Sequence, residues 1–368
     1  MTLNAYYTLG RSGLRVSRLA LGTMTFGQAG WGCDAGTAGQ ILDTYLEAGG
    51  NFVDTADIYG EGVGEELVGS LIAERGVRDR TVLATKFTLS ARAGDPNAGG
   101  NGRKAMLRAL EGSLRRLGTD YVDLYILHAW DAHTPVEEVM RGLDDLVSSG
   151  KVRYVAFSNV PAWYAARAQT LAEWRAYEPL CALQLEYSLV ERGIEYEFPP
   201  LCQELGMGLM TWGPLASGLL SGKYSGASES GGLPDGRLKT TAARTPRTLD
   251  KRTERSWGIV AELTKVAGEI GQSPAQVAVN WVANRPTVTS VLLGASKRHQ
   301  IQSTVAALSF NLPDDLQARL NTASALPRTA PYGLLPWLQR SVNARTRDKP
   351  DGPRALRDWV GPVRRSRE

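Results

Sequence analysis

Four ionisable residues end or follow short apolar runs of the sequence, and together they could act on one bond. Asp54 and Tyr59 lie in "NFVDTADIYG", Lys86 ends "TVLATK", and His128 ends "YVDLYILH". A lysine ammonium favours the phenolate of a nearby tyrosine and so lowers the tyrosine pKa from about 10. An aspartate can hold that ammonium in place, and a histidine can hydrogen-bond the same substrate oxygen. The set suits protonation of a carbonyl oxygen that becomes an alkoxide, with tyrosine as the general acid.

Each of these residues also has a plainer interpretation by itself. An aspartate at a strand end is more often a cap or an ion-pair partner, and a histidine in an apolar run is more often a core residue. A lysine after a buried run is unusual, because its ammonium must be paired. The presence of all four residues at or just after the ends of three successive apolar runs favours an active site.

The elements that would position these residues follow from the alternation of apolar runs with helical patterns. The runs are continuously apolar, as strands covered on both faces are. Their alternation with helices predicts a parallel sheet, and eight such units predict an α/β fold, a (β/α)8 TIM barrel. The alternative is a doubly wound open sheet, but no G-x-G-x-x-G opens the first unit. The predicted strands are 17–23, 51–55, 81–86, 121–128, 151–159, 181–188, 206–212 and 289–296.

Three other segments lie outside the eight units. Residues 6–17 read as a β-hairpin that caps the bottom of the barrel. Residues 213–250, after the seventh strand, are rich in Gly, Ser, Thr and Pro, and a loop of that length is usually functional. We expect one barrel domain over 1–325 and a basic, Arg/Pro-rich tail over 326–368 that is partly disordered or packs over the barrel.

Composition excludes several classes of protein. From Leu326 onward there are ten Arg/Lys and four Asp/Glu residues, so the net charge of +4 comes from the tail, and no nucleic-acid surface is implied. No apolar run is long enough for a membrane span. Three histidines and three widely spaced cysteines fit no metal site and no disulfide framework, and a reducing cytoplasm is expected.

The longer stretches around the four residues resemble the aldo-keto reductase family, and the similarity covers roughly residues 6–325. Within that family the sequence is more similar to the bacterial aryl-alcohol-dehydrogenase and potassium-channel β-subunit branch. The resemblance implies NADPH-dependent reduction of an aldehyde or ketone, with Tyr59 as proton donor, Lys86 and Asp54 lowering its pKa, and His128 orienting the carbonyl. The stretches that carry it are "NFVDTADIYGEGVGEELVG", "LATKF", "YVDLYILHAWDAHTPVEEVMRGLDDLVSSGKVRYVAFSN" and "WGPLASGLLSGKY".

The same resemblance assigns residues to the cofactor NADPH/NADP+. Ser158, Asn159 and Gln184 would hold the nicotinamide amide, and Trp212 would stack on its ring. The 213–250 loop would fold over the pyrophosphate. Further residues that would contact or line the cofactor are Thr23, Met24, Asp54, Pro214, Leu215, Ser217, Lys223, Arg237, Gly294 and Thr304.

The cofactor's 2′-phosphate has a candidate site that the residues themselves suggest. "GASKRHQIQST" follows the last strand and opens a helix, and a helix N-terminus binds anions through its free N–H groups. Lys297 adds a positive charge, and the resemblance adds Ser296 and Gln300 as contacts. The sequence departs from the family pattern at Gly213, Lys297 and Thr304, where Ser, Arg and Asn are common, which would weaken the cofactor grip or relax the preference for NADPH over NADH.

The substrate stays open at this stage. Trp31, Phe87 and Trp130 follow strands and are candidates for an apolar substrate pocket, while Cys33, Tyr332 and Trp337 are weaker candidates near the mouth. A general carbonyl reductase and a reductase of an NDP-linked keto-deoxysugar are equally compatible. Rival interpretations are a cofactor-sensing regulatory subunit with little turnover and a metal-dependent barrel hydrolase. The expected partner is a small carbonyl substrate, and a homo-oligomer stays open; the regulatory subunit would in addition need a partner protein.

Overall fold

A closed barrel of eight parallel strands forms the centre of the computed structural model, which describes residues 3–90, 94–224 and 250–342. The strand order is β10-β3-β4-β5-β6-β7-β8-β9, and β10 pairs with both β3 and β9. The predicted (β/α)8 TIM barrel is therefore confirmed, and the open sheet is excluded because the sheet has no free edge. The strands are β3 (Leu19–Gly22), β4 (Phe52–Asp54), β5 (Val82–Phe87), β6 (Val122–Leu127), β7 (Val152–Ser158), β8 (Leu180–Glu186), β9 (Gly208–Trp212) and β10 (Val288–Gly294).

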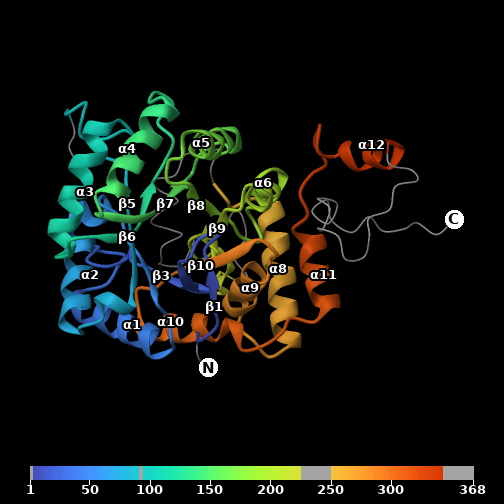
Figure 1. Cartoon of the computed structure of the whole chain (residues 1–368). Helices are drawn as coiled ribbons and strands as arrows, with labels where there is room; N and C mark the ends of the chain where they lie inside the picture. Colours follow the sequence, from blue (N-terminus) through green and yellow to red (C-terminus); the bar gives the residue numbers. More distant parts are fainter. Residues whose placement is uncertain (1–2, 91–93, 225–249, 343–368) are drawn as a thin grey trace.

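Helices surround these strands (Figure 1). Gly118 and Gly206 follow α3 and α6 in the left-handed conformation, where glycine has no steric penalty. A capping box at Ser273 and Gln276 begins α9. The helices are α1 (Ala35–Glu47), α2 (Val63–Glu74), α3 (Arg103–Leu117), α4 (Val136–Ser148), α5 (Ala162–Arg175), α6 (Phe198–Leu205), α8 (Glu254–Glu269), α9 (Pro274–Ala283), α10 (Arg298–Val305), α11 (Asp314–Ala323) and α12 (Leu335–Val342).

The predicted N-terminal hairpin closes one end of the barrel. Strands β1 (Tyr6–Thr8) and β2 (Arg15–Ser17) pair in antiparallel fashion. Leu9 and Val16 are fully buried, and they pack in one cluster with the barrel-interior residues Phe52 and Leu124. Because this end is plugged, a ligand can approach only the other end, where the strands finish.

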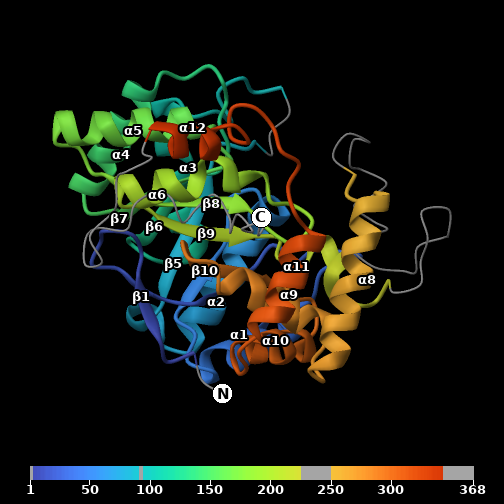
Figure 2. The same cartoon turned by 90° about the vertical axis from the view of Figure 1, so that its right-hand side faces the viewer.

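After α11 the chain runs along the outside of the barrel. Tyr332 stacks on Tyr196, with ring centroids 5.0 Å apart, and its hydroxyl donates to Glu197. Helix α12 (red) lies at the upper right edge of the molecule in Figure 1 and on the side that faces the viewer in Figure 2, and none of its residues is buried. No helix among the described residues is long and apolar enough to cross a membrane.

Candidate active site

A buried ion pair forms the floor of the open end of the barrel. Asp54 ends β4, and Lys86 lies near the end of the neighbouring strand β5. The Lys86 ammonium donates to Asp54 Oδ1 at 2.5 Å, to the Thr55 carbonyl at 2.9 Å, and lies 3.2 Å from the Tyr59 hydroxyl. Asp54 and Lys86 are each about 1% exposed. One ammonium group thus connects the carboxylate to the phenol.

A tight turn carries Tyr59 back over this pair. The Tyr59 N–H donates to the Ala56 carbonyl, and the 3₁₀ helix Tyr59–Gly62 follows. Gly60 and Glu61 both have positive φ, at 58° and 56°, a conformation that few residues other than glycine adopt. Helix α2 then begins at Val63, and at its second residue, Gly64, a Cβ atom would lie 3.0 Å from the Tyr59 carbonyl oxygen. Glycine at position 64 therefore lets the helix approach the tyrosine closely.

The pKa values of Lys86 and His128 differ from those of the free side chains. Burial alone would lower the pKa of Lys86, but Asp54 and Tyr59 outweigh burial, so the pKa of Lys86 is raised and the ammonium stays charged. Burial and then the Lys86 ammonium lower the pKa of His128 to about 3. The imidazole is therefore neutral near pH 7, and its ring meets the Tyr59 ring edge to face, with centroids 6.0 Å apart. A neutral imidazole can donate its one N–H to a substrate oxygen, but it lacks the acidic second proton of an imidazolium ion and so is not the general acid.

A cleft of about 1840 Å³ extends from this floor across the ends of the strands. It exceeds the 300–1,000 Å³ of ordinary ligand pockets, so it has room for a dinucleotide and a second molecule. Tyr59, His128 and Trp31 line it. The predicted cofactor residues that line it are Met24, Asp54, Ser158, Asn159, Gln184, Trp212, Pro214, Leu215, Ser217, Lys223, Gly294, Ser296, Lys297, Gln300 and Thr304.

Beside the tetrad, the cleft wall presents groups that suit a carboxamide. Ser158 is fully buried, and its hydroxyl has no hydrogen-bond partner among the described residues. The Gln184 amide nitrogen donates to Asp54 Oδ2 at 2.8 Å, which leaves its oxygen for a ligand. The Trp212 indole N–H donates to the Asn159 side chain, which in turn donates to the His128 carbonyl. A buried hydroxyl without a partner is costly unless a ligand satisfies it, so these residues fit a nicotinamide amide.

The far end of the cleft is the N-terminus of α10. The backbone N–H groups of Ser296 and Lys297 both donate to Gln300 Oε1, at 2.8 and 3.1 Å. Gln300 thus caps the helix. Lys297 and Arg298 are both exposed at this end, and Lys297 lines the cleft. The Thr304 hydroxyl donates within the helix to the Gln300 carbonyl. These groups fit an anion such as a phosphate.

Comparison with known proteins agrees with this geometry. The model of the Aldo/keto reductase family matches residues 18–325. The chain belongs to the aldo/keto reductase family. It is 38% identical over 327 residues to "Uncharacterized oxidoreductase YrpG" of Bacillus subtilis, covering 86% of this chain and 94% of that protein. Family membership makes the chain an oxidoreductase, and the family generally uses a nicotinamide dinucleotide.

Two further relatives come from the branch that the sequence resembles. "Aryl-alcohol dehydrogenase [NADP(+)]" of Phanerodontia chrysosporium is 32% identical over 334 residues, covering 87% of this chain and 86% of that protein. "Probable voltage-gated potassium channel subunit beta" of Oryza sativa subsp. japonica is 38% identical over 309 residues, covering 82% of this chain and 90% of that protein. The branch therefore contains proteins named as enzymes and proteins named as channel subunits.

Several predicted residues of this aldo/keto reductase lie away from the cleft surface. Phe87 is fully buried and stacks on Tyr125, with ring centroids 4.7 Å apart, so the prediction that it lines the substrate pocket is wrong. Thr23 is also fully buried, and its N–H and hydroxyl donate to the Asp54 carbonyl. Trp130 packs against Trp163, outside the cleft lining.

The remaining candidates are settled by burial or position. Cys33 is 8% exposed, and burial raises the pKa of its thiol to about 11, so it is not a reactive thiolate. Neither Tyr332 nor Trp337 lines the cleft. Arg237 lies outside the described residues. In the described part of the chain, no group of three or more His, Cys, Asp or Glu residues could hold a metal ion.

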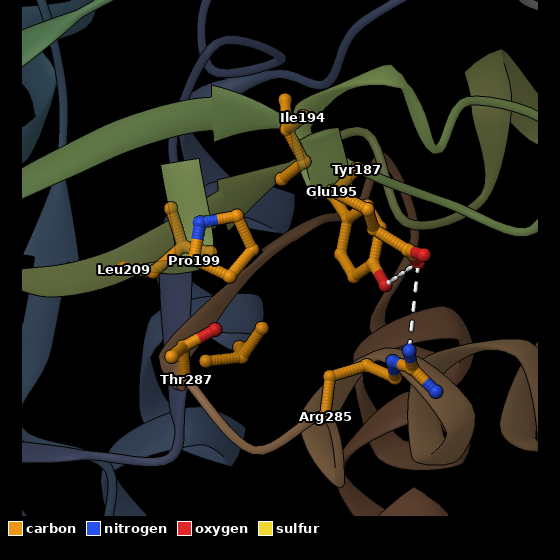
Figure 3. Close-up of a pocket in the computed structure, with 8 residues that line it drawn as sticks. Tyr187, Ile194, Glu195, Pro199, Leu209, Arg285 and Thr287 are labelled. Atoms are coloured by element: carbon orange, nitrogen blue, oxygen red, sulfur yellow. Dashed lines mark hydrogen bonds and ion pairs between the residues drawn. The ribbon is translucent and has the colours of Figure 1, made fainter. Parts of the chain in front are cut away.

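A second, much smaller cavity has no room for a substrate. Figure 3 shows it beside Tyr187, Glu195 and Arg285, and its volume of about 20 Å³ suits a single water molecule. Glu195 accepts from the Tyr187 hydroxyl at 2.5 Å and from Arg192. Arg192 also donates to Ser324, directly after α11. We assign this cluster a structural role, because it ties the end of α11 to the barrel.

Sequence reasoning missed a pair of carboxyl groups beneath the tyrosine turn. Glu65 of α2 is fully buried and accepts hydrogen bonds from Thr85, at 2.5 Å, and from Arg116. Asp57 Oδ1 is buried without a hydrogen-bond partner among the described residues. Burial and then the charge of Glu65 raise the pKa of Asp57 to about 7, although Arg116 opposes this. The second aspartate of "DTAD" was the available signal, but its burial depends on the fold.

Replacing Asp57 with Asn should stabilise the protein at alkaline pH. The folded carboxyl, with a pKa of about 7, holds a proton that the unfolded chain loses near pH 4, so stability falls as pH rises from 4 to 7. Asp57→Asn removes this penalty and should gain about 2 kcal/mol at pH 8, with much less gain at pH 5. Urea unfolding at both pH values measures the difference.

The matched control is Asp34→Asn. Asp34 caps α1, and hydrogen bonds from Thr37 lower its pKa. Its side chain is exposed, so there is no buried charge to remove. Asparagine caps a helix about as well as aspartate does, and this variant should gain no stability at pH 8. Equal stability of Asp57→Asn and the parent at both pH values would contradict the raised pKa of Asp57.

Proposed function

We propose that this protein is an NADPH-dependent reductase of aldehydes or ketones in which Tyr59 donates the proton. The observation that carries the proposal is the position of the Lys86 ammonium, which bridges Asp54 and the Tyr59 hydroxyl at the floor of the cleft. Such an arrangement acts where negative charge develops on a substrate oxygen. Membership of the aldo/keto reductase family identifies the chain as an oxidoreductase. The proposal adds which cofactor it uses and which residue donates the proton.

Each residue of the floor has one task in this proposal. When bound, the cofactor supplies a hydride to the carbonyl carbon. The Tyr59 hydroxyl gives its proton to the carbonyl oxygen as charge develops there, and the Lys86 ammonium stabilises the phenolate that remains. Asp54 keeps the ammonium charged and in place. The neutral His128 hydrogen-bonds the carbonyl oxygen and so orients it toward Tyr59.

Ser158, Asn159 and Gln184 would hold the nicotinamide amide in this scheme, and Trp212 would lie against the ring. Because Gln184 also donates to Asp54, the amide site and the ion pair share one hydrogen-bond chain. That link would fix the distance between the cofactor and the proton donor, which matters because misplacement by about 1 Å can cost a hundredfold in rate.

The experiment that tests this function is a screen for carbonyl-dependent oxidation of NADPH. Purified protein is incubated with aldehydes, quinones and keto-sugars, and NADPH absorbance is followed. Turnover that depends on the carbonyl supports the proposal and names the substrate class, including an NDP-linked keto-deoxysugar. Tight NADPH binding without turnover on any class would refute the enzymatic role.

Lys297 should determine the preference for NADPH over NADH. Loss of one charge-assisted contact to the 2′-phosphate should weaken NADPH binding about tenfold in Lys297→Ala and leave NADH binding unchanged. Fluorescence titration with both cofactors measures this. The control is Lys223→Ala in the same cleft, which the family resemblance places at the pyrophosphate and which should weaken both cofactors alike. Equal losses for both cofactors in Lys297→Ala would rule out the 2′-phosphate assignment.

A second candidate function is a cofactor-sensing regulatory subunit. It is favoured by the similarity to a protein named as a potassium channel subunit. Slow turnover together with tight NADPH binding would support it, whereas fast turnover on a small aldehyde would exclude it.

The proposal extends to the organisation and location of the chain. Residues 1–325 would form the catalytic domain, with 326–368 as an accessory tail. All three cysteines are buried and free, which suits a reducing cytoplasm.

A further inference from the structure

The turn after β5 contains an unusual backbone conformation close to the tetrad. Thr88, two residues after Lys86, has φ of 117°. A β-branched residue at positive φ is a genuine outlier, because its side chain collides with its own backbone. Such strain persists only where the surroundings enforce it, and it gathers at functional sites. The hydrogen bonds of Thr88 therefore indicate which arrangement requires this strained conformation.

These contacts form a clamp around the chain that carries His128. The Thr88 hydroxyl donates to Asn101 Oδ1 at 2.6 Å. It also accepts, at 3.3 Å, from the His128 N–H, which donates to the Phe87 carbonyl as well. The Asn101 amide nitrogen donates to the Ala129 carbonyl at 3.0 Å, and its backbone N–H donates to Asp131 at 2.8 Å. Asn101 is fully buried and Thr88 is 9% exposed. We name Thr88 and Asn101 the Thr88–Asn101 clamp.

The clamp matters because no hydrogen bond fixes the imidazole of His128 through its Nδ1 atom. That atom is buried and has no partner among the described residues. Catalytic histidines are usually oriented by a hydrogen bond to the second ring nitrogen. Here the backbone is held instead. The N–H of His128 is shared between the Phe87 carbonyl, at 3.0 Å, and the Thr88 hydroxyl, at 3.3 Å. The Asn101 amide holds the carbonyl of Ala129, and Asn159 donates to the carbonyl of His128.

We propose that Thr88 and Asn101 are positioning residues, which hold the backbone of residues 128–129 so that the His128 imidazole meets the carbonyl oxygen. The proposal rests on the proposed reductase function. It also explains the strain at Thr88, since a relaxed backbone would carry the hydroxyl away from both partners. A merely structural clamp would stabilise the fold without affecting His128 in particular.

Matched variants separate the two roles. Thr88→Val keeps the shape and the β-branch but removes the hydroxyl, whereas Thr88→Ser keeps the hydroxyl. We expect Thr88→Val to lower kcat about tenfold to a hundredfold with the Kd for NADPH unchanged, and Thr88→Ser to stay within about twofold of the parent. Equal kcat in Thr88→Val and the parent would overturn the proposal.

A double-mutant cycle tests whether the effect passes through His128. In a His128→Gln background, Thr88→Val should lower kcat by less than about twofold, because there is no longer an imidazole to misplace. A full tenfold further loss in that background would show that the clamp acts generally on the fold, and would also overturn the proposal.

A measurement without turnover keeps this test separate from the reductase proposal. The chain has only three histidines, so labelled histidine gives three sets of ring signals in NMR spectra. The His128 signals should not titrate between pH 5 and 8, since its pKa is about 3, and in Thr88→Val they should shift or broaden while the other two sets stay unchanged. Unchanged His128 signals would overturn the clamp proposal, whereas absence of carbonyl turnover in the parent protein would overturn only the proposed function.

Discussion

Replacing Tyr59 with Phe should lower kcat for carbonyl reduction about a thousandfold while NADPH still binds. Phenylalanine keeps the ring that packs edge to face with His128 and loses only the hydroxyl beside the Lys86 ammonium. General acid catalysis by a positioned group contributes about 10² to 10⁴ in rate, and Tyr59 is the proposed acid. Steady-state kinetics with the best carbonyl from the screen gives kcat, and fluorescence titration gives the NADPH affinity.

The result can be separated from a folding defect. Lys86 retains Asp54 and the Thr55 carbonyl as partners in Tyr59→Phe, so the free energy of unfolding should change little. Tyr196→Phe is the matched control, because the Tyr196 hydroxyl donates to the Pro327 carbonyl outside the cleft, and its turnover should equal that of the parent. Unchanged turnover in Tyr59→Phe would refute the proton-donor role.

The barrel and the tetrad could be predicted from sequence for the same physical reason. A parallel strand covered on both faces must be continuously apolar, so an ionisable residue at its carboxyl end stands out. Because all carboxyl ends of a parallel barrel meet at one rim, Asp54, Lys86 and His128 must lie close together once the strands are placed. The Lys86–Asp54 pair at 2.5 Å is the outcome.

The misplaced residues show where this reasoning was incomplete. Successive side chains of a strand point to opposite faces, so if Lys86 enters the barrel mouth, Phe87 must point outward. It does so and stacks on Tyr125. Alternation within "TVLATKF" predicts this result, whereas the assignment of Phe87 to the pocket rests only on its place at the end of the apolar run.

Other features depend on contacts that are distant in sequence. Burial and then the charge of Glu65 raise the pKa of Asp57. Glu65 is itself held by Arg116, 51 residues away, and Asn101 reaches Ala129 across a separation of 28 residues. No local pattern reveals such pairs. The capping role of Gln300, by contrast, has a local sequence signal. A Gln three residues after the N-cap of a helix is typical of a capping box, but the family resemblance assigns Gln300 only to the phosphate.

Lys86→Met should damage both catalysis and stability. The variant removes the ammonium that stabilises the phenolate, so kcat should fall about a thousandfold, as in Tyr59→Phe. It also leaves the buried Asp54 carboxylate without its cation. Loss of one partner of a buried pair costs about 3 to 5 kcal/mol, although the Gln184 amide still donates to Asp54. Denaturant unfolding and steady-state kinetics measure the two effects.

The double variant Asp54→Asn/Lys86→Met distinguishes electrostatic catalysis from structural support. With both charges removed, no buried charge is left unpaired, and most of the lost stability should return. Turnover should stay low, because nothing then stabilises the phenolate. Lys151→Met is the matched control: it breaks the pair with Glu111, whose side chains are 41% and 47% exposed, and should cost at most about 1 kcal/mol. If the stable double variant regained turnover, the ammonium would have only a folding role, and the phenolate would need another source of stabilisation.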